Sequence, residues 1–364
     1  MTGDGPADDG AAEGAVPAGD TATAEDAAAS SPLVYDLPDD PDVPVDHAGE
    51  HPGSLMARLE RPRTDVATRL AVVADPHLAT RERDTSKLFE HTERHLRAAF
   101  EDANRRDVDQ VVSVGDITKD GEPWNYARFD ELLADLDGPF LSVPGNHDVP
   151  KAGDNHETIP VAEYAERYAP AEYPFVHRVG GVDLVCLNSS GTEETLYDSH
   201  DGLVTEPDVA WLRETLPDLE TPVAVTHFNL PTTSDQLRGH RDAVEREMAI
   251  PPVLREPEPF VDALATNDVP LMLTGHLHMP TTAVQRGVRE VMVPTTCSFP
   301  QAYLLVEVGP RGTEIRMVPV ADHGGIRYGH AARWADSVTA RGLTSMAAVR
   351  CAQFPLVDEW DERT

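Results

Sequence analysis

The sequence predicts an α/β protein with a largely parallel β-sheet. Short apolar runs recur between residues 70 and 273, and each of them ends in polar residues. Stretches with apolar residues at helical spacing separate the first of these runs. Strand, polar turn and helix in repeated order are typical of right-handed βαβ units, whose strands are parallel.

Two patterns define the elements of the first half. A short continuous apolar run, such as Leu70 to Ala74, is typical of a buried strand. Apolar residues three and four positions apart are typical of a helix with one buried face. In chain order we expect a strand over residues 70–74, a helix over about 85–104, a strand over 111–114, a helix over about 123–136 and a strand over 140–143.

In the second half of the chain, predicted helices and strands alternate again, and antiparallel strands follow them. Thr205 can cap a helix, and Pro207 is tolerated in its first turn. Residues 228–257 form a long excursion containing Pro and Arg, and loops of that length are usually functional or mobile. The expected elements are a helix over residues 158–168, a strand over 182–187, a helix over 205–216, a strand over 223–226, a helix near 260–265, a strand over 271–273, antiparallel strands near 283–293, 302–308 and 313–318, and a helix near 331–350.

Composition divides the chain into three parts. Residues 1–32 contain no Lys or Arg, so we expect a disordered acidic tail, which an irregular Pro- and Asp-rich lead-in continues through residue 62. Residues 63–320 form the folded domain. Residues 321–364 form a C-terminal extension, which we expect to be helical and packed on the domain.

The net charge is −34, and only three basic residues are lysines (Lys87, Lys119 and Lys151). An acidic surface usually repels nucleic acid and anionic membranes. An acidic excess along the whole chain with few lysines is typical of adaptation to a salt-rich cytoplasm, where ions screen the self-repulsion. We therefore hypothesise a halophilic source, in which case the acidity says little about partners.

The compartment is expected to be the cytoplasm. The three cysteines (Cys186, Cys297 and Cys351) are far apart and form no C-x-x-C pair, which favours reduced thiols. The N-terminus lacks the features of a signal peptide, and no apolar run is long enough for a membrane span.

Metal-binding residue types follow five of the predicted strands. They are Asp75 and His77, Asp116, Asn146 with His147 and Asp148, His227, and His276 with His278. Side chains beyond the carboxyl ends of neighbouring parallel strands lie together. Carboxylate, amide and imidazole ligands suit two borderline divalent metals, which at about 3.5–4 Å separation promote in-line phosphoryl displacement.

Spacing predicts how these side chains point. The members of the pairs Asp75–His77 and His276–His278 would face the same side in extended backbone. The Asn146–His147 neighbours would diverge, so that one could bind metal and the other could face the substrate. Three glycines each precede a predicted ligand at a turn that a Cβ could crowd: Gly115, Gly145 and Gly275.

The series D-x-H, G-D, G-N-H-D, H and G-H-x-H, carried by these residues in order, resembles the calcineurin-like metallophosphoesterase superfamily. The sequence from Gly115 to Gly121, with Tyr126 and Val143-Pro144-Gly145, is similar to sequences of the class III cyclic-nucleotide phosphodiesterase branch. The resemblance implies a four-layer α/β/β/α sandwich with two mixed β-sheets, and it makes residues 63–320 a catalytic domain.

The resemblance also implies a role for each residue. The first metal would be held by Asp75, His77 and His278. The second metal would be held by Asn146, His227 and His276, with Asp116 bridging the two. A metal-bridging hydroxide would attack in line, His147 would protonate or stabilise the leaving oxygen, and Asp148 would orient His147. The metals would be Mn, Fe, Zn or Co, since such ligands suit all four.

The implied activity is hydrolysis of a small-molecule phosphodiester. Alternatives of the same superfamily are a phosphomonoesterase or a nucleotide pyrophosphatase, and a remote one is a scaffold without catalysis. Lys119-Asp120-Gly121 lacks the Arg of protein phosphatases, and the G-D-L-F block of repair nucleases is absent.

Other residues have simpler interpretations. His91 and His95 lie four apart on a predicted helix, where we expect a solvated flank. Cys297 follows a predicted strand and could reach the edge of the site, although a core thiol is the preferred interpretation.

Overall fold

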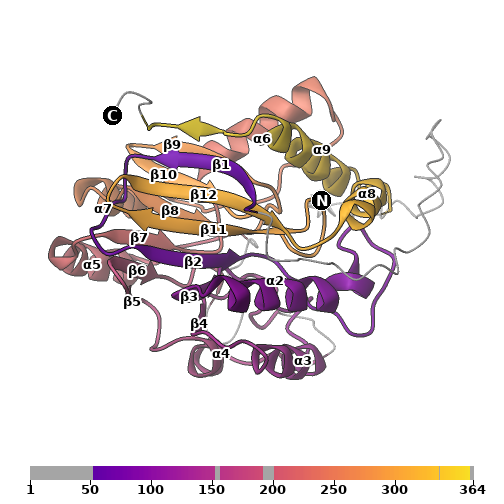
Figure 1. Cartoon of the computed structure of the whole chain (residues 1–364), viewed down its shortest axis with the longest axis horizontal. Helices are drawn as coiled ribbons and strands as arrows, with labels where there is room; N and C mark the ends of the chain where they lie inside the picture. Colours follow the sequence, from indigo (N-terminus) through magenta and orange to yellow (C-terminus); the bar gives the residue numbers. More distant parts are fainter. Residues whose placement is uncertain (1–51, 152–155, 192–200, 336, 361–364) are drawn as a thin grey trace, which may run out of the picture. The chain divides into compact units, whose positions relative to one another are not determined.

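The computed structural model describes residues 52–151, 156–191, 201–335 and 337–360. These residues form two mixed β-sheets whose inner faces share one apolar core, with helices on the outer faces (Figure 1). This is the four-layer α/β/β/α arrangement, so the predicted fold class is confirmed. The predicted acidic tail lies outside the described residues.

The first sheet has seven strands in the order β13-β1-β12-β11-β2-β3-β4. Strands β2, β3 and β4 are parallel, and β11 is antiparallel to both β2 and β12. The strands are β1 (Ser54–Leu59), β2 (Thr68–Val73), β3 (Gln110–Ser113), β4 (Phe140–Ser142), β11 (Ala302–Gly309), β12 (Gly312–Pro319) and β13 (Val357–Asp358). The helices on its outer face are α2 (Thr92–Arg106), α3 (Pro123–Leu133) and α4 (Val161–Tyr168).

The second sheet has six strands in the order β5-β6-β7-β8-β10-β9. Strands β6, β7, β8 and β10 are parallel, while β5 and β9 pair antiparallel at the two edges. The strands are β5 (Phe175–Val179), β6 (Val182–Cys186), β7 (Pro222–Val225), β8 (Leu271–Thr274), β9 (Thr281–Gln285) and β10 (Val288–Met292). Its outer face is covered by α5 (Glu206–Thr215) and α7 (Glu258–Thr266).

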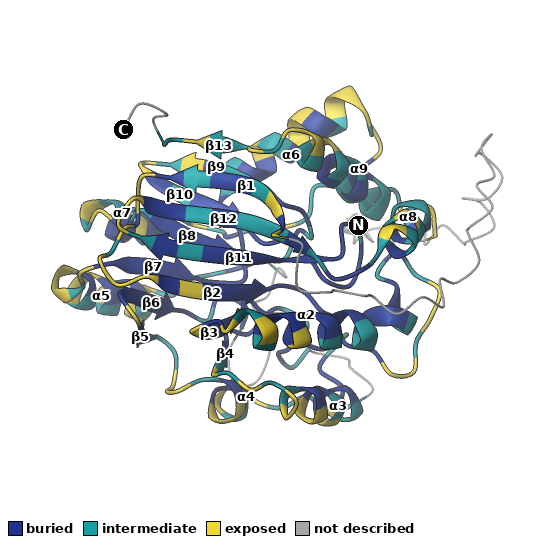
Figure 2. Cartoon of the chain, in the orientation of Figure 1, coloured by how far each residue is buried: buried dark blue, intermediate teal, exposed yellow. Residues whose placement is uncertain are grey.

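Continuous apolar runs arise because the central strands are buried on both faces (Figure 2). In β2, Leu70 and Val72 face the core between the sheets, whereas Ala71 and Val73 face the helices. Successive side chains of a strand point to opposite faces, so both sets must be apolar when both faces are covered.

Several element predictions differ from the structure. The single run predicted near residues 283–293 is the hairpin of β9 and β10. The lead-in is not irregular over residues 54–59, which form β1 and pair with β12 and β13. The helix predicted from residue 85 begins only at Thr92, after a left-handed Leu88 (φ 50°) and a 3-10 turn, η1 (Phe89–His91). The single helix predicted near 331–350 is two helices, α8 (His323–Ala332) and α9 (Val338–Ala352), each capped by a side chain at its own start.

The excursion over residues 228–257 contains a helix rather than only loop. Helix α6 (Pro231–Ala243) begins at a proline, which suits a first helical turn. It packs against α9 through Leu237, which shares an apolar cluster with Met346 and Ala347. The C-terminal residues 323–352 thus pack on the domain as helices. Among the described residues, none of the helices is long and apolar enough to cross a membrane.

Candidate metal centre

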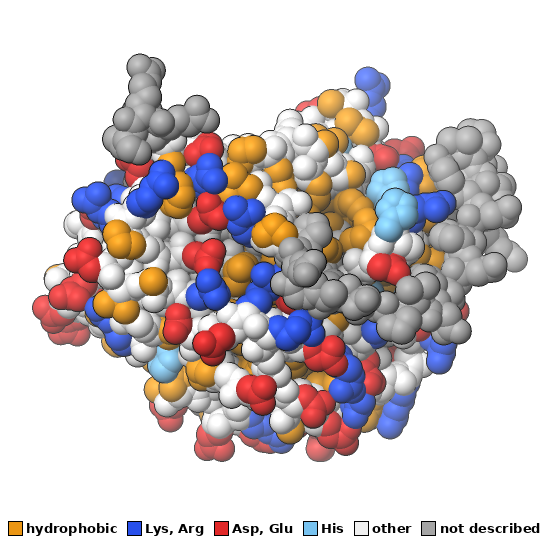
Figure 3. All heavy atoms as spheres, viewed as in Figure 1, with side chains coloured by type: hydrophobic (Ala, Val, Ile, Leu, Met, Phe, Trp, Pro, Cys, Tyr) orange, Lys and Arg blue, Asp and Glu red, His pale blue; other side chains and the backbone are white. Residues whose placement is uncertain are grey.

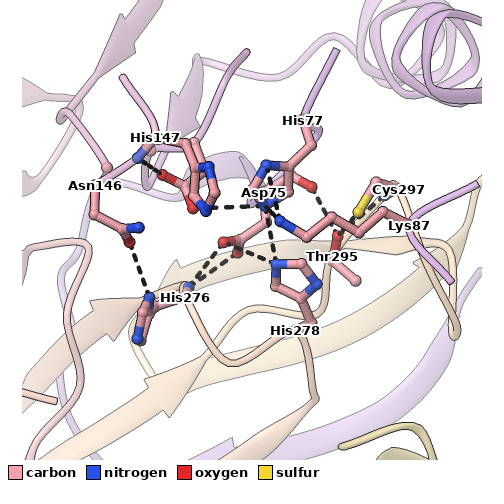
Figure 4. Close-up of polar contacts among 12 residues, drawn as sticks. Asp75, His77, Lys87, Asn146, His147, His276, His278, Thr295 and Cys297 are labelled. Atoms are coloured by element: carbon pink, nitrogen blue, oxygen red, sulfur yellow. Dashed lines mark hydrogen bonds and ion pairs between the residues drawn. The ribbon is translucent and has the colours of Figure 1, made fainter. Parts of the chain in front are cut away.

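Loops after five strands bring the predicted site residues together. Asp75 and His77 follow β2, and Asp116 follows β3. Asn146 and His147 follow β4, and the remaining histidines follow β7 and β8. The side chains converge from both sheets at one end of the sandwich (Figure 4). Of these residues, Asp75, His77 and His227 are fully buried.

The first ligand group contains Asp75, His77, Asp116 and His278. The Nε2 atoms of His77 and His278 are 3.1 Å apart. Nε2 of His278 lies 3.4 Å from Asp75 Oδ1, and Nε2 of His77 lies 3.5 Å from Asp116 Oδ2. Atoms of types that bind divalent metals are therefore linked by three contacts of 3.5 Å or less.

The second ligand group contains Asn146, His227, His276 and again Asp116. Asn146 Oδ1 lies 3.1 Å from both His227 Nε2 and His276 Nδ1. His227 Nε2 lies 3.4 Å from Asp116 Oδ2, the same oxygen that approaches His77. One carboxylate oxygen thus lies between the two groups.

The hydrogen bonds of the outer ring nitrogens show that these residues fit bound cations. His227 Nδ1 lies 2.8 Å from Val114 O, and His276 Nε2 lies 2.8 Å from Pro252 O. Backbone carbonyls only accept, so each of these nitrogens carries a proton. In the neutral His276 ring, Nδ1 then directs a lone pair at the Asn146 oxygen. A cation between these atoms relieves that repulsion.

The buried carboxylates favour positive charge on two of the histidines. Burial opposes charging of His227, but Asp116 and Asp75 outweigh it and raise the pKa of His227 to about 9. Burial likewise opposes charging of His278, while Asp75 raises its pKa to about 9. Burial and then the charge of His227 lower the pKa of His276 to about 3. The carboxylates therefore draw positive charge into both groups.

The backbone of the ligand loops differs from the extended form that we predicted. The φ angles are 47° at Asp75, 42° at His77, 70° at His276 and 58° at His278. This is the left-handed region, which is unfavourable for residues with a Cβ and is found at functional sites. The members of each pair still reach a common centre, but through turns. The prediction for the glycines agrees with the structure, since a Cβ on Gly275 would lie 2.8 Å from Asp75 Oδ2.

His147 contacts a different carboxylate from the predicted one. Its Nδ1 lies 3.0 Å from Asp120 Oδ1, and its backbone N–H donates to Asp116 Oδ1 over 2.8 Å. Asp148 instead accepts backbone N–H groups of Gly145 and Thr118, at 3.0 and 3.2 Å, and closes the turn. The prediction that Asp148 orients His147 is therefore wrong, because Asp148 points into the core.

Four further residues differ from what the sequence suggested. Lys87 was not identified, yet its Nζ lies 3.1 Å from His77 Nε2 (Figure 4). Cys297 is buried, but it also reaches the site, with Sγ and ligand nitrogens of His77 and His278 all within 4.8 Å of one another. His91 and His95 are 6% and 0% exposed rather than solvated, because their helix face is covered, for His91 by Tyr328 of α8.

Residues 68–280 match the family model described as calcineurin-like phosphoesterase. The chain belongs to this family. The predicted superfamily is thereby confirmed, and the matched segment contains all nine predicted site residues.

Relatives of the calcineurin-like chain include two cyclic nucleotide phosphodiesterases. It is 27% identical over 209 residues to a probable cyclic nucleotide phosphodiesterase of Rhodococcus erythropolis, covering 55% of this chain and 61% of that protein. It is 26% identical over 271 residues to a cAMP/cGMP dual specificity phosphodiesterase of Mycobacterium tuberculosis, covering 71% of this chain and 76% of that protein. The chain thus spans less than two thirds of the Rhodococcus relative.

A solved structure agrees with the fold. A dimetal phosphatase from Danio rerio superposes with a TM-score of 0.54 and 14% identity, over 71% of this chain and 98% of that one. This likeness supports the fold alone.

The loop after β7 shows how this calcineurin-like phosphoesterase supports its histidines. Phe228 packs on the His276 ring, with centroids 4.4 Å apart. Asn229 donates to the buried Glu290 over 3.0 Å and to Thr274 over 2.8 Å. Side chains behind the loop therefore fix the backbone that carries His227.

Proposed function

We propose that this protein is a binuclear metal-dependent phosphoesterase that hydrolyses phosphodiester bonds, with cyclic nucleotides as the substrate class. The position of Asp116 carries the proposal. Its Oδ2 lies 3.5 Å from His77 and 3.4 Å from His227, as a carboxylate shared by two metals would. The names of the two phosphodiesterase relatives support the substrate class.

The proposed ligands are those of the two groups. Asp75, His77 and His278 would hold one ion, Asn146, His227 and His276 the other, and Asp116 both. Two divalent ions there, Mn, Fe, Zn or Co, would polarise phosphoryl oxygens and activate water for in-line displacement.

His147 is proposed to exchange a proton with the leaving oxygen. Its Nδ1 faces the Asp120 carboxylate, which keeps that nitrogen protonated and leaves Nε2 for the substrate. Burial, and then the charge of Lys87, lower the pKa of His147 to about 4, so the ring is neutral in the free site. A bound phosphate anion would favour the charged ring, which could then donate its Nε2 proton.

Hydrolysis by the purified full chain tests the proposal. With Mn²⁺ added, we expect cleavage of bis-p-nitrophenyl phosphate and of 3′,5′-cyclic AMP. His147→Ala should lower kcat by about 10²- to 10⁴-fold, the usual contribution of a positioned acid or base, while bound metal is unchanged.

His177→Ala on β5 is the control, because His177 bonds Gln110 far along the strand from the site, and both activity and metal content should be retained. Faster cleavage of p-nitrophenyl phosphate than of either diester would favour the monoesterase alternative. If the metal-loaded protein cleaves none of these esters, the proposed function is wrong.

A further inference from the structure

The candidate metal centre opens into a cavity of about 240 Å³. One side of the cavity carries His77, Asp116, His147, His276 and His278. The other side comes from the segment before α2, the segment after β10, and the first half of α9. Helix α9 lies outside residues 68–280, the segment that matches the family model. The part of the cavity away from the metals is therefore built by this chain's own C-terminal helix.

Helix α9 is held firmly at the cavity. Gly342 lies so close to Met248 that a Cβ would overlap its side chain. Arg341 pairs with Glu245 at 2.8 Å, and Thr339 Oγ1 accepts the Ala249 N–H over 3.2 Å. The same 244–253 loop provides the Pro252 carbonyl that contacts His276. The loop thus links α9 to the metal centre through fixed contacts.

The wall opposite the metals combines apolar and hydroxyl groups. Phe299, Ala340 and Leu343 line it, and Phe299 and Leu343 are only partly buried. Ser337, which caps α9, and Thr344 of α9 also line the cavity and add hydroxyl groups. An aromatic and aliphatic surface with a few hydroxyl groups suits a base and a sugar, which present a flat apolar ring and several hydrogen-bonding atoms.

Lys87 adds a positive charge where substrate phosphate would enter. Its Nζ lies 3.1 Å from His77 Nε2, and the side chain lines the cavity. An ammonium beside two divalent cations is repelled unless an anion lies between them. A phosphoryl oxygen is an anion of the right kind, and a lysine binds it as a point charge.

We propose that the α9 wall, meaning Phe299, Ala340, Leu343 and Thr344, binds the nucleoside part of a nucleotide phosphodiester, while Lys87 binds a phosphoryl oxygen. This inference rests on the proposed phosphodiesterase function and assigns its substrate specificity to the C-terminal helix. The wall selects for the nucleoside, and Lys87 acts on every phosphate ester alike.

Two esters with the same leaving group test the wall. Thymidine 5′-(p-nitrophenyl phosphate) has a nucleoside where methyl p-nitrophenyl phosphate has a methyl group. Leu343→Trp fills the cavity, so we expect KM for the thymidine ester to rise at least tenfold and KM for the methyl ester to change less than twofold. Val349→Trp on the same helix is the control, because Val349 is 43% exposed and does not line the cavity, and it should change neither KM.

For variants of Lys87 we expect KM to rise for both esters, not for the thymidine ester alone. Lys87→Met should raise KM for both esters by a similar factor of about ten, and Lys87→Arg should restore most of the loss, because it keeps the charge. Metal content and the thermal melting temperature, measured for each variant, show that the fold is retained.

Calorimetric titration with thymidine 5′-monophosphate gives a readout that does not need turnover. Leu343→Trp should weaken its binding at least tenfold, and Val349→Trp should not. Equal effects of the two Trp variants, or equal loss on both esters for Leu343→Trp, would overturn the α9 wall. If the wild type cleaves neither ester, the proposed function fails, and the binding titration still decides whether the wall holds a nucleoside.

Discussion

His147 is positioned by carboxylates on the loop that follows β3. Asp120 contacts its Nδ1 at 3.0 Å, and Asp116 accepts its backbone N–H at 2.8 Å. Asp120 also forms an ion pair with Lys151. The Asp120 carboxylate thus fixes the orientation of the His147 ring. Carboxylates behind metal-bound histidines have a comparable role.

Removing the charge of Asp120 should therefore reduce turnover without removing metal. For Asp120→Asn we expect kcat to fall by about 10- to 100-fold, the usual cost of losing such a partner, while KM changes little. The pH profile should also move, because the carboxylate favours the protonated ring and its loss lowers the pKa of His147 in the substrate complex. Asp218→Asn on an exposed turn is the control. A large loss of bound metal in Asp120→Asn would contradict this role.

A second prediction for a single residue concerns Gly145. A Cβ there would overlap the Asp116 carboxylate and backbone. Gly145→Ala should therefore displace Asp116, lower the bound metal content, and reduce the free energy of unfolding by about 1–3 kcal/mol through overpacking. Gly239→Ala is the matched control, because a Cβ there meets nothing within 4 Å. In the middle of α6 it should stabilise the helix by about 0.5–1 kcal/mol. Equal metal binding by both variants would refute the prediction.

The sequence predicted the polar residues of this centre, but not all of their partners. The nine residues could be named because all of them lie on loops that follow buried strands, and strand ends of one sandwich lie together. Asp120 and Lys87 lie on loops whose paths depend on tertiary packing. Asp148 was misassigned because adjacency in sequence was taken for contact. In a tight turn, neighbouring side chains diverge.

At the scale of elements, Glu290 ties three segments together. This buried residue of β10 accepts hydrogen bonds from Asn229, Thr233 and Thr274, at 3.0, 2.8 and 2.8 Å. It also faces the Leu230 N–H at 3.3 Å. Burial raises the pKa of Glu290, and these donors partly offset that rise. The carboxylate fixes the loop after β7, which carries His227, and the start of α6.

Glu290 variants should thus affect both stability and the metal centre. Glu290→Gln directs an amide N–H₂ at donors that need acceptors, so we expect the free energy of unfolding to fall by about 1–3 kcal/mol. Metal affinity should fall with it, because His227 is on the same loop.

Urea unfolding and metal titration of the folded protein measure the two effects. Glu307→Gln is the control, since Glu307 on β11 forms a partly exposed ion pair with Arg69, and its loss should cost about 0–1 kcal/mol. A Glu290 variant as stable as this control would disprove the role of the network.

Sequence patterns were sufficient to predict some of the strands and helices, but not all of them. The strands β2, β3, β7 and β8 were predicted because burial on both faces makes them continuously apolar. Strand β1 was missed because its partner β12 lies more than 250 residues away, and its burial does not alternate, since Met56 and Ala57 are both buried where the pairing register shifts. The break between α8 and α9 has a local signal, the Ser337 cap, which accepts the Ala340 N–H over 3.1 Å.

At the scale of the whole molecule, charge is the dominant feature. Acidic and basic side chains are interspersed on the visible face (Figure 3). Ion pairs such as Arg69–Glu307 and Arg58–Glu314 form among them. Arg178 pairs with Asp183 at 2.8 Å and with Glu220 at 3.0 Å. Exposed pairs such as Arg178–Glu220 each contribute about 0–1 kcal/mol. With 64 acidic against 30 basic residues, acidic side chains outnumber basic ones by 34.

The excess of acidic over basic side chains predicts that salt stabilises the protein. Like charges about 10 Å apart repel at 0.1 M salt but are largely screened at 1 M, where the Debye length is about 3 Å. The same salt weakens ion pairs, but the surplus of 34 negative charges makes relief of repulsion the larger effect. We expect the free energy of unfolding in urea, which is uncharged, to rise between 0.1 and 2 M KCl.

A charge variant separates screening from general salting-out. Glu101, Glu214 and Asp218 are exposed, so replacing all three with Lys removes repulsion without disturbing the core. This triple variant should be more stable than the wild type at 0.1 M KCl and should gain less from 2 M KCl, whereas salting-out would stabilise both equally. A wild type as stable in dilute buffer as in 2 M KCl would refute the halophilic interpretation of the composition, because an excess of this size would then be compensated within the fold rather than by the surrounding ions.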